Sequence, residues 1–218
     1  MEGSNLPAQS TSFIGRVNEL NEIADLLNHS ARRLLTLAGP GGIGKTRLAV
    51  EAATHQINNC ANGVFFVALA PISSPDLLST AIANTLNVSV YGAETPDVQI
   101  VNHLREKHML LVLDSFEHML EATGLLSAIL SAAPALKILV TSRERLNLEQ
   151  EWVLALEGLP FPDGQAKAPL ESYAAVQLFV QRARQVQAGF SIAQNAQPVV
   201  AICQQVEGMP LGLELAAT

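Results

Sequence analysis

The chain has 218 residues, a formal net charge of −7 and 49% hydrophobic residues. This length suits one domain with an appendage, or two small domains, and the apolar content allows a sizeable core. The acidic balance argues against direct nucleic-acid binding by this segment. No apolar run approaches the length of a membrane span, and the start lacks a signal-peptide pattern. The two cysteines, Cys60 and Cys203, form no pair or metal motif, so we expect a reduced, cytoplasmic setting.

Short apolar runs alternate with helical patterns over most of the chain. We expect a flexible, loosely held arm over 1–12 and a helix from about 17 to 29. Strands are predicted at 34–38, 64–68, 110–114, 137–141 and 152–156, and helices between them at 46–57, 76–86, 96–106 and 115–132. Strands that alternate with helices predict an α/β fold, with a parallel sheet covered on both faces.

A proline- and glycine-rich stretch over 160–169 marks a change in composition. We therefore predict a nucleotide-binding P-loop domain over 13–165 and a helical subdomain over 166–218. The helices expected there cover 171–188, 196–206 and 211 onward. Because the last residues still look helical, we expect the chain to stop inside an element, as a shortened fragment would. Trp152 and Phe179 are expected in the core.

A glycine-rich turn follows the first strand and precedes a helix, the context that a phosphate-binding P-loop requires. Its glycines leave the backbone N–H groups free to turn toward phosphate oxygens, and the positive end of the helix dipole points at the same place. Lys45 is expected to reach the outer phosphates and Thr46 to ligate Mg²⁺. The backbone amides from Ala38 to Arg47 are expected to grip the triphosphate, with the side chain of Arg47 in solvent. The turn consists of Gly39, Pro40, Gly41, Gly42, Ile43, Gly44, Lys45 and Thr46.

Two acids lie at the end of the third predicted strand. Ligands bind at the carboxyl ends of strands in open parallel sheets, so Asp114 is expected to support Mg²⁺ beside Thr46, through water. The alternative for Asp114 is a helix cap. Glu117 is a candidate for polarising an attacking water, and its alternative is helix-dipole complementation or a capping box with Asp114.

Thr141-Ser-Arg143 ends the fourth strand at the same edge of the sheet. Arg143 there is placed to contact a terminal phosphate. The alternative is a surface arginine paired with Glu144 or Glu149.

Five motifs in this order resemble the STAND ATPases, the signal-transducing relatives of NB-ARC and apoptotic ATPases. They are Phe13-Ile-Gly-Arg16, the P-loop, Leu111-Val-Leu-Asp-Ser-Phe-Glu-His118, Thr141-Ser-Arg-Glu-Arg-Leu146 and Gly208-Met-Pro-Leu211. The sequence is most similar to the ATPase modules of AfsR-like and LuxR-like bacterial transcriptional regulators. The resemblance covers essentially the whole chain.

The resemblance implies a P-loop NTPase of the ASCE type, with strand order 5-1-4-3-2, followed by a helical subdomain. It implies that ATP or ADP binds with Mg²⁺, that Asp114 supports the metal, that Glu117 is the acidic catalytic candidate and that Arg143 senses the phosphate. It also implies that Pro210 closes over the adenine or ribose. The segment expected against adenine is Phe13, Ile14, Gly15 and Arg16, with Ile14 and Gly15 nearest the base.

Two departures from the family pattern stand out. Ser115 replaces the asparagine often found after the strand aspartate. The family's winged-helix domain, with its nucleotide-contacting histidine, is expected to lie outside these 218 residues, so we expect that it cannot lock ADP in this fragment. The implied partners are therefore winged-helix, repeat or effector domains outside this chain, and association of ATP-bound copies.

The favoured hypothesis is a nucleotide-operated switch with slow Mg²⁺-dependent ATP hydrolysis. A non-hydrolysing nucleotide-binding interaction module is the first alternative, which a single-turnover assay would decide. A small-molecule kinase is the second. A kinase would need a basic lid, and residues 144–170 offer few cations for one, Arg145 and Lys167.

Overall fold

The computed structural model describes residues 3–163 and 168–218. The chain forms two compact units. One, the sheet unit, comprises Met1–Gln9, Asn18–Gly39 and Lys45–Ala155. The other, the helical unit, comprises Ser10–Val17, Pro40–Gly44 and Leu156–Thr218. The domain boundary predicted at residues 165/166 lies outside the described residues, and the predicted division stays a prediction.

A five-stranded parallel sheet forms the centre of the sheet unit, in the order β2-β3-β4-β1-β5. Read from the other edge, this is the predicted order 5-1-4-3-2, so the predicted fold class is confirmed. The strands are β1 (Leu34–Ala38), β2 (Val64–Ala68), β3 (Leu110–Asp114), β4 (Lys137–Ser142) and β5 (Glu151–Ala155). All five carboxyl ends therefore meet at one edge of the sheet, the edge where a P-loop belongs.

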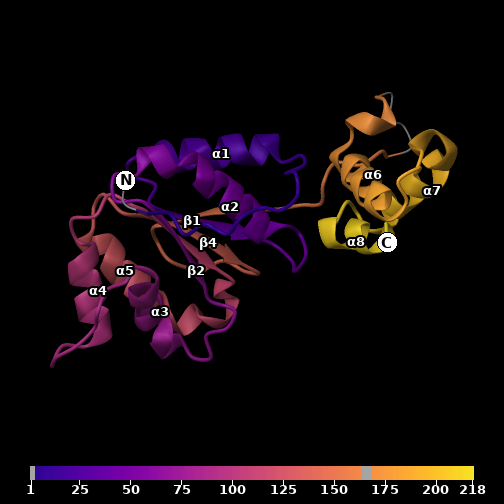
Figure 1. The fold of residues 1–218 in the computed structure, drawn as a ribbon. Helices are drawn as coiled ribbons and strands as arrows, with labels where there is room; N and C mark the ends of the chain where they lie inside the picture. The colour runs from indigo at the N-terminus through magenta and orange to yellow at the C-terminus, as the bar shows by residue number, and fades with distance from the viewer. Residues whose placement is uncertain (1–2, 164–167) are drawn as a thin grey trace. The chain divides into compact units, whose positions relative to one another are not determined.

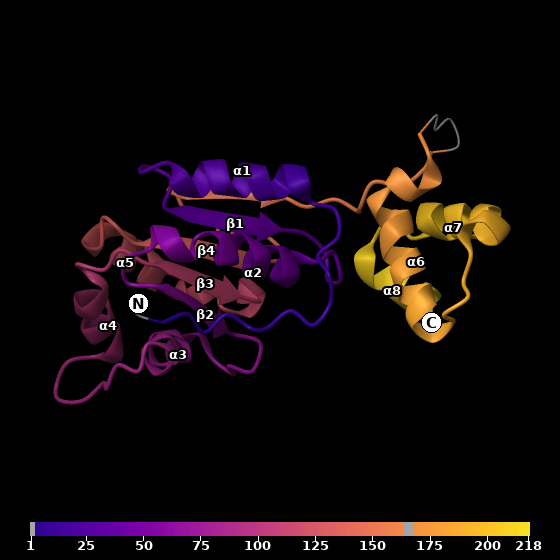
Figure 2. The ribbon, with the colours of Figure 1, turned by 45° about the horizontal axis from the view of Figure 1, so that its top comes forward.

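Helices cover both faces of this sheet, with α1 and α2 on one face and α3, α4 and α5 on the other (Figures 1 and 2). Their bounds are α1 Val17–Asn28, α2 Lys45–His55, α3 Leu78–Thr85, α4 Pro96–Leu104 and α5 Thr123–Ala132. Alternate strand residues such as Leu111, Leu113, Ile138 and Val140 join the core under α3–α5. Burial on both faces explains why these strands read as continuous apolar runs.

The chain after β3 differs from the single long helix that we expected. Ser115 adopts a left-handed conformation with φ of 66°. Two 3₁₀ turns, Phe116–His118 and Leu120–Ala122, then precede α5. Phe116 is fully buried in the core, which fixes this irregular segment against the sheet. Glu117 therefore lies in a 3₁₀ turn rather than at the start of an α-helix.

The N-terminal arm is attached to the edge of the sheet. Ser4 forms a parallel bridge with Val64 of β2. The Asn5 side chain accepts the N–H of Phe66 at 2.6 Å and donates to its carbonyl at 2.9 Å. The amide group of Asn5 thus satisfies backbone groups of β2 that would otherwise face solvent at a sheet edge.

Trp152 was wrongly expected in the core. It lies on the edge strand β5 and is 44% exposed, with the guanidinium carbon of Arg32 4.3 Å from its ring centroid. Phe179, in contrast, is buried as expected and lies 6.0 Å from Phe190 between ring centroids. An edge strand leaves one flank open, which periodicity alone does not reveal.

The helical unit packs three helices around its own core. They are α6 (Ala174–Val186), α7 (Ile192–Gln205) and α8 (Pro210–Ala216). Pro198 lies inside α7, where Asn195 departs from helical φ/ψ and kinks the helix. The Arg182 guanidinium bonds the Glu214 carboxylate at 2.6 Å and ties α6 to α8. Across the described residues, no helix combines the length and apolar character needed to cross a membrane.

A buried hydroxyl in the central strand gives a first prediction. Thr36 in β1 has no exposed surface, and its Oγ1 has no hydrogen-bond partner among the described residues. Because an unpaired buried hydroxyl is costly, Thr36→Val is expected to raise the free energy of unfolding by about 1 kcal/mol. Urea denaturation followed by circular dichroism measures this. A loss of stability would show that the hydroxyl is satisfied.

Candidate nucleotide-binding site

The P-loop joins β1 to α2 at the carboxyl edge of the sheet. In the sheet unit, the Gly39 N–H donates to the Ser142 carbonyl at 3.3 Å, which ties the loop's start to the end of β4. Gly42 and Gly44 have φ of 81° and 93°, values that only glycine adopts without strain. The Lys45 ammonium donates to the Gly39 carbonyl at 2.7 Å, so the side chain folds back along the loop.

The electrostatic setting of Lys45 favours an anion as a further partner. Burial lowers the pKa of Lys45 below its ordinary 10.5; the Glu117 carboxylate opposes this shift, the Arg143 charge adds to it, and Asp114 opposes it weakly. A lowered pKa means that the surroundings solvate the ammonium less well than water does. A phosphate group next to Lys45 would restore the stability of the charged form.

Asp114 lies at the tip of β3, where predicted, and its carboxylate collects hydroxyl groups. Its Oδ1 accepts a hydrogen bond from Thr46 Oγ1 at 2.6 Å and another from Thr141 Oγ1 at 2.7 Å. Its Oδ2 has a weak contact with Ser115 Oγ at 3.4 Å. Asp114 is 8% exposed, and among the described residues its carboxylate makes no capping bond to a helix N–H. The structure thus brings Asp114 and Thr46 together, as the Mg²⁺ prediction requires.

These donors suit a magnesium ion. The Thr46 hydroxyl donates a hydrogen bond to Asp114, which leaves the lone pairs of Oγ1 for a metal. The second carboxylate oxygen of Asp114 remains an acceptor for metal-bound water. Mg²⁺ prefers such sites, with few protein oxygens and several retained waters. Within residues 3–163 and 168–218, no cluster of three or more His, Cys, Asp or Glu offers a competing metal site.

Glu117 and Arg143 form an ion pair, with 3.2 Å between Arg143 Nε and Glu117 Oε1. The alternative pairing of Arg143 with Glu144 or Glu149 is therefore not what the structure shows. The Arg143 side chain is 68% exposed and the Glu117 side chain 25%. The other carboxylate oxygen, Glu117 Oε2, is buried and has no hydrogen-bond partner in the described chain. An orphan acceptor of this kind is placed to take a hydrogen bond from a ligand or a water.

The Phe13–Arg16 segment belongs to the helical unit. The Arg16 guanidinium donates to the Ile43 carbonyl at 3.1 Å and to the Glu157 carbonyl at 2.6 Å, and the side chain is 7% exposed. Gly15 has φ of 70°, and a Cβ there would lie 2.7 Å from the Ala174 Cβ. The segment is thus fixed to residues of the P-loop, whereas its contact with adenine stays a prediction.

The Gly208-Met-Pro-Leu211 turn also contacts the loop within the helical unit. The Leu211 N–H donates to the Gly42 carbonyl at 3.2 Å. A Cβ on Gly42 would lie 2.8 Å from the Leu211 Cβ, and one on Gly44 would lie 3.8 Å from the Pro210 Cγ. No sequence pattern indicates the Leu211 contact, because an aliphatic residue after a proline has many possible uses.

A pocket of about 880 Å³ lies in the helical unit beside Pro40 and Ile43. Its walls carry three carboxylates, from Glu157, Asp163 and Glu207, and no cationic side chain among the lining residues that the structure describes. The remaining lining residues are Leu156, Gly158, Leu159, Pro160, Phe161, Gln204 and Met209. Such a pocket suits an uncharged ring or sugar and repels phosphate.

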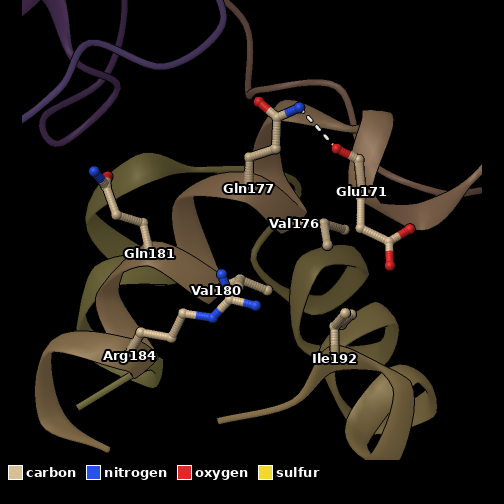
Figure 3. Close-up of a pocket in the computed structure, with 7 residues that line it drawn as sticks. All are labelled: Glu171, Val176, Gln177, Val180, Gln181, Arg184 and Ile192. Carbon is tan, nitrogen blue, oxygen red and sulfur yellow. Dashed lines mark hydrogen bonds between the residues drawn. The ribbon is translucent and has the colours of Figure 1, made fainter. Parts of the chain in front are cut away.

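A smaller pocket of about 340 Å³ lies between α6, α7 and the turn that holds Glu171 (Figure 3). Three buried aliphatic side chains, Val176, Val180 and Ile192, form part of its lining. The Gln177 amide bonds the Glu171 carbonyl at 2.7 Å, the contact drawn in Figure 3. None of the five motifs contributes to this pocket, so we do not place nucleotide there.

Comparison with known proteins decides the family. A model of the NB-ARC domain matches residues 16–149, a span that includes the P-loop, Asp114 and Arg143. The chain belongs to the NB-ARC family. The match confirms the resemblance to NB-ARC and related STAND ATPases that the motifs indicated.

Two bacterial relatives show how this NB-ARC chain relates to longer proteins. An uncharacterised protein of Mycobacterium tuberculosis is 35% identical over 209 residues, which are 95% of this chain and 50% of the relative. Another protein of that organism, provisionally named an HTH-type transcriptional regulator, is 36% identical over 187 residues, 85% of this chain and 20% of the relative. The NB-ARC chain thus spans half the length of one relative and a fifth of the other.

Solved structures support the same fold. A STAND protein with a tetratricopeptide repeat sensor from Pyrococcus horikoshii matches with a TM-score of 0.64 and 16% identity, over 97% of this chain and 31% of that chain. The ORC2 protein of Aeropyrum pernix matches with a TM-score of 0.56 and 13% identity, over 96% of this chain and 70% of that chain. Both likenesses concern the architecture of the NB-ARC chain.

Proposed function

We propose that this NB-ARC chain is the nucleotide-dependent switch of a longer, transcriptional regulator. The observation that carries the proposal is the pairing of Thr46 with Asp114 beside Lys45, at the edge of the sheet where a P-loop binds its ligand. The role in transcription is supported by the relative that is provisionally named an HTH-type regulator, of which this chain covers 20%.

In this proposal, the P-loop amides and Lys45 hold the β- and γ-phosphates of ATP. Mg²⁺, when bound by Thr46 and through water by Asp114, neutralises charge on the phosphate oxygens. The uncharged end of the nucleotide lies toward Phe13–Arg16 and Pro210. Arg143 senses the terminal phosphate, and ADP lacks the group that Arg143 would contact.

The Glu117–Arg143 ion pair gives the switch its two states. Arg143 Nε lies 3.2 Å from Glu117 Oε1. A γ-phosphate would compete for the same guanidinium, since phosphate is a strong bidentate partner of arginine. Release of Glu117 would free its carboxylate to orient the attacking water. The proposed hydrolysis is a slow, in-line attack by this water on the terminal phosphate. We further propose that the ATP-bound form associates with other copies or releases an effector domain.

The experiment that tests binding is a titration of fluorescent ATP and ADP against the full chain, with and without Mg²⁺. Saturable binding that Mg²⁺ strengthens is the expected result. Absence of binding in both conditions would overturn the proposal.

A non-hydrolysing module is the second candidate. It is favoured by Ser115, which stands next to the aspartate where many hydrolytic relatives place a glutamate, and by the engagement of Glu117 with Arg143. Single-turnover hydrolysis of radiolabelled ATP separates the two. We expect slow phosphate release by the wild type and a rate roughly a hundredfold lower in Glu117→Gln, because the variant lacks the carboxylate that orients water. The Glu121→Gln variant, on the next 3₁₀ turn, is the matched control. No phosphate release by the wild type would establish the non-hydrolysing module.

A further inference from the structure

The carboxylate that the proposed function assigns to the metal is itself held by a residue from the neighbouring strand. Thr141 lies near the carboxyl end of β4, and its side chain is 1% exposed. Its hydroxyl donates to Asp114 Oδ1 at 2.7 Å and accepts the N–H of Ser115 at 2.9 Å. Both the donor and the acceptor capacity of the hydroxyl are therefore used at the end of β3.

We propose that Thr141 is a positioning residue, which orients the Asp114 carboxylate for magnesium. This inference rests on the proposed function, because it concerns the metal that accompanies the nucleotide. It assigns no contact between Thr141 and the nucleotide or the ion.

The geometry shows why a second hydroxyl is needed. Asp114 Oδ1 takes one hydrogen bond from Thr46 of the P-loop and one from Thr141 of β4. Thr46 would itself be a ligand of the metal, whereas Thr141 belongs to a buried strand. Among the residues that the structure describes, Oδ2 has only the 3.4 Å contact to Ser115 Oγ, which is too long to fix the carboxylate. Thr141 is thus the donor from the buried sheet that holds this carboxylate without itself binding the metal.

Thr141 also stabilises the turn that follows. Ser115 has φ of 66°, and a left-handed conformation costs a serine about 1–2 kcal/mol. The Ser115 N–H gains an acceptor in Thr141 Oγ1, which offsets part of this cost. The same turn leads the chain to Glu117. One hydroxyl therefore links the aspartate to the segment that carries the proposed catalytic acid.

A role in packing alone would not need the hydroxyl. Valine has nearly the same shape as threonine and is favoured in strands, so Thr141→Val keeps the packing while removing both hydrogen bonds. Thr141→Ser keeps the hydroxyl and loses a methyl group. Thr36→Val is the matched control, because it makes the same change at a buried, unpaired hydroxyl on the neighbouring strand β1.

The test measures how much Mg²⁺ the full chain needs to retain fluorescent ADP, and repeats the titration with Mn²⁺ by electron paramagnetic resonance. For Thr141→Val we expect the half-maximal metal concentration to rise about tenfold, the effect of one hydrogen bond to a charged group. ADP affinity in EDTA should stay within twofold of the wild type. Thr141→Ser and Thr36→Val should need the same metal concentration as the wild type.

Several outcomes would overturn the inference. One is an unchanged metal requirement in Thr141→Val. A second is an equal shift in Thr141→Val and Thr141→Ser, which would indicate packing. A third is a loss of ADP affinity that is as large in EDTA as in Mg²⁺, which would indicate an effect on nucleotide binding and not on the metal. If Thr141→Val fails to fold by circular dichroism, Thr141→Ala is judged by the same criteria.

The wild type separates this inference from the proposed function. A wild type that retains no nucleotide in Mg²⁺ would overturn both. If the wild type retains nucleotide and Thr141→Val needs the same metal concentration, the inference alone is overturned.

Discussion

Lys45→Ala is expected to weaken the binding of ATP and ADP roughly a thousandfold, or about 4 kcal/mol. In the structure, the ammonium bonds the Gly39 carbonyl, the start of the loop whose amides face the proposed phosphates. Its removal takes away the charged hydrogen bonds to phosphate and leaves the negative charges of Glu117 and Asp114 less compensated. Isothermal titration calorimetry in Mg²⁺ measures the change.

Two further variants make this experiment decisive. Lys45→Met keeps the length of the side chain and removes its charge, so it should lose nearly as much affinity as Lys45→Ala. Lys107→Ala removes a lysine just before the amino end of β3, at the opposite edge of the sheet, and should bind as the wild type does. Equal nucleotide retention by the wild type and Lys45→Ala would contradict the phosphate-binding role of the loop.

Gly208→Ala is expected to lower the stability of the helical unit by about 4 kcal/mol, through left-handed strain and backbone overlap. Gly208 has φ of 67°, and a Cβ there would overlap the Leu159 carbonyl oxygen. Its own carbonyl accepts the Leu159 N–H at 2.8 Å, so neither backbone can retreat without losing that bond. Native-state hydrogen exchange of the amides in α7 and α8 reports the loss.

The matched control for this prediction is Gly189→Ala. Gly189 lies in the same unit, between α6 and α7, and a Cβ there would meet nothing within 4 Å. Its stability should stay within about 0.5 kcal/mol of the wild type. If Gly208→Ala unfolds no more easily than Gly189→Ala, then the close approach of Gly208 to Leu159 does not limit stability.

Much of the fold followed from the sequence because its signals are local. Five apolar runs predicted five strands, and the glycine-rich turn between a strand and a helix predicted a P-loop. The strand order came from the family resemblance. The place of Asp114 beside Thr46 came from the rule that the carboxyl ends of parallel strands meet at one edge, and the 2.6 Å contact agrees with it.

Other parts of the site depend on residues that are distant in the sequence. Periodicity assigns Thr141 to a strand, but only packing of β4 beside β3 brings its hydroxyl to Asp114, 27 positions earlier. The pairing of Arg143 with Glu117 arises because the left-handed Ser115 and two 3₁₀ turns replace the expected helix. The one available signal for Thr141 was a hydroxyl residue at the end of a strand, two positions before the arginine.

By itself, the sequence determined the class of this protein, because a P-loop and its partner strand are short patterns whose backbone requirements are met only by certain residues. The tertiary structure alone decided which side chains pair at the edge of the sheet, and that Trp152 lies exposed under Arg32. Hydrogen bonds and ion pairs depend on atoms within about 3 Å of one another, and the positions of such atoms are set by the packing of whole strands and turns. For that reason the chemistry of the loop could be read from the chain, whereas the orientation of Asp114 and the partner of Glu117 could not.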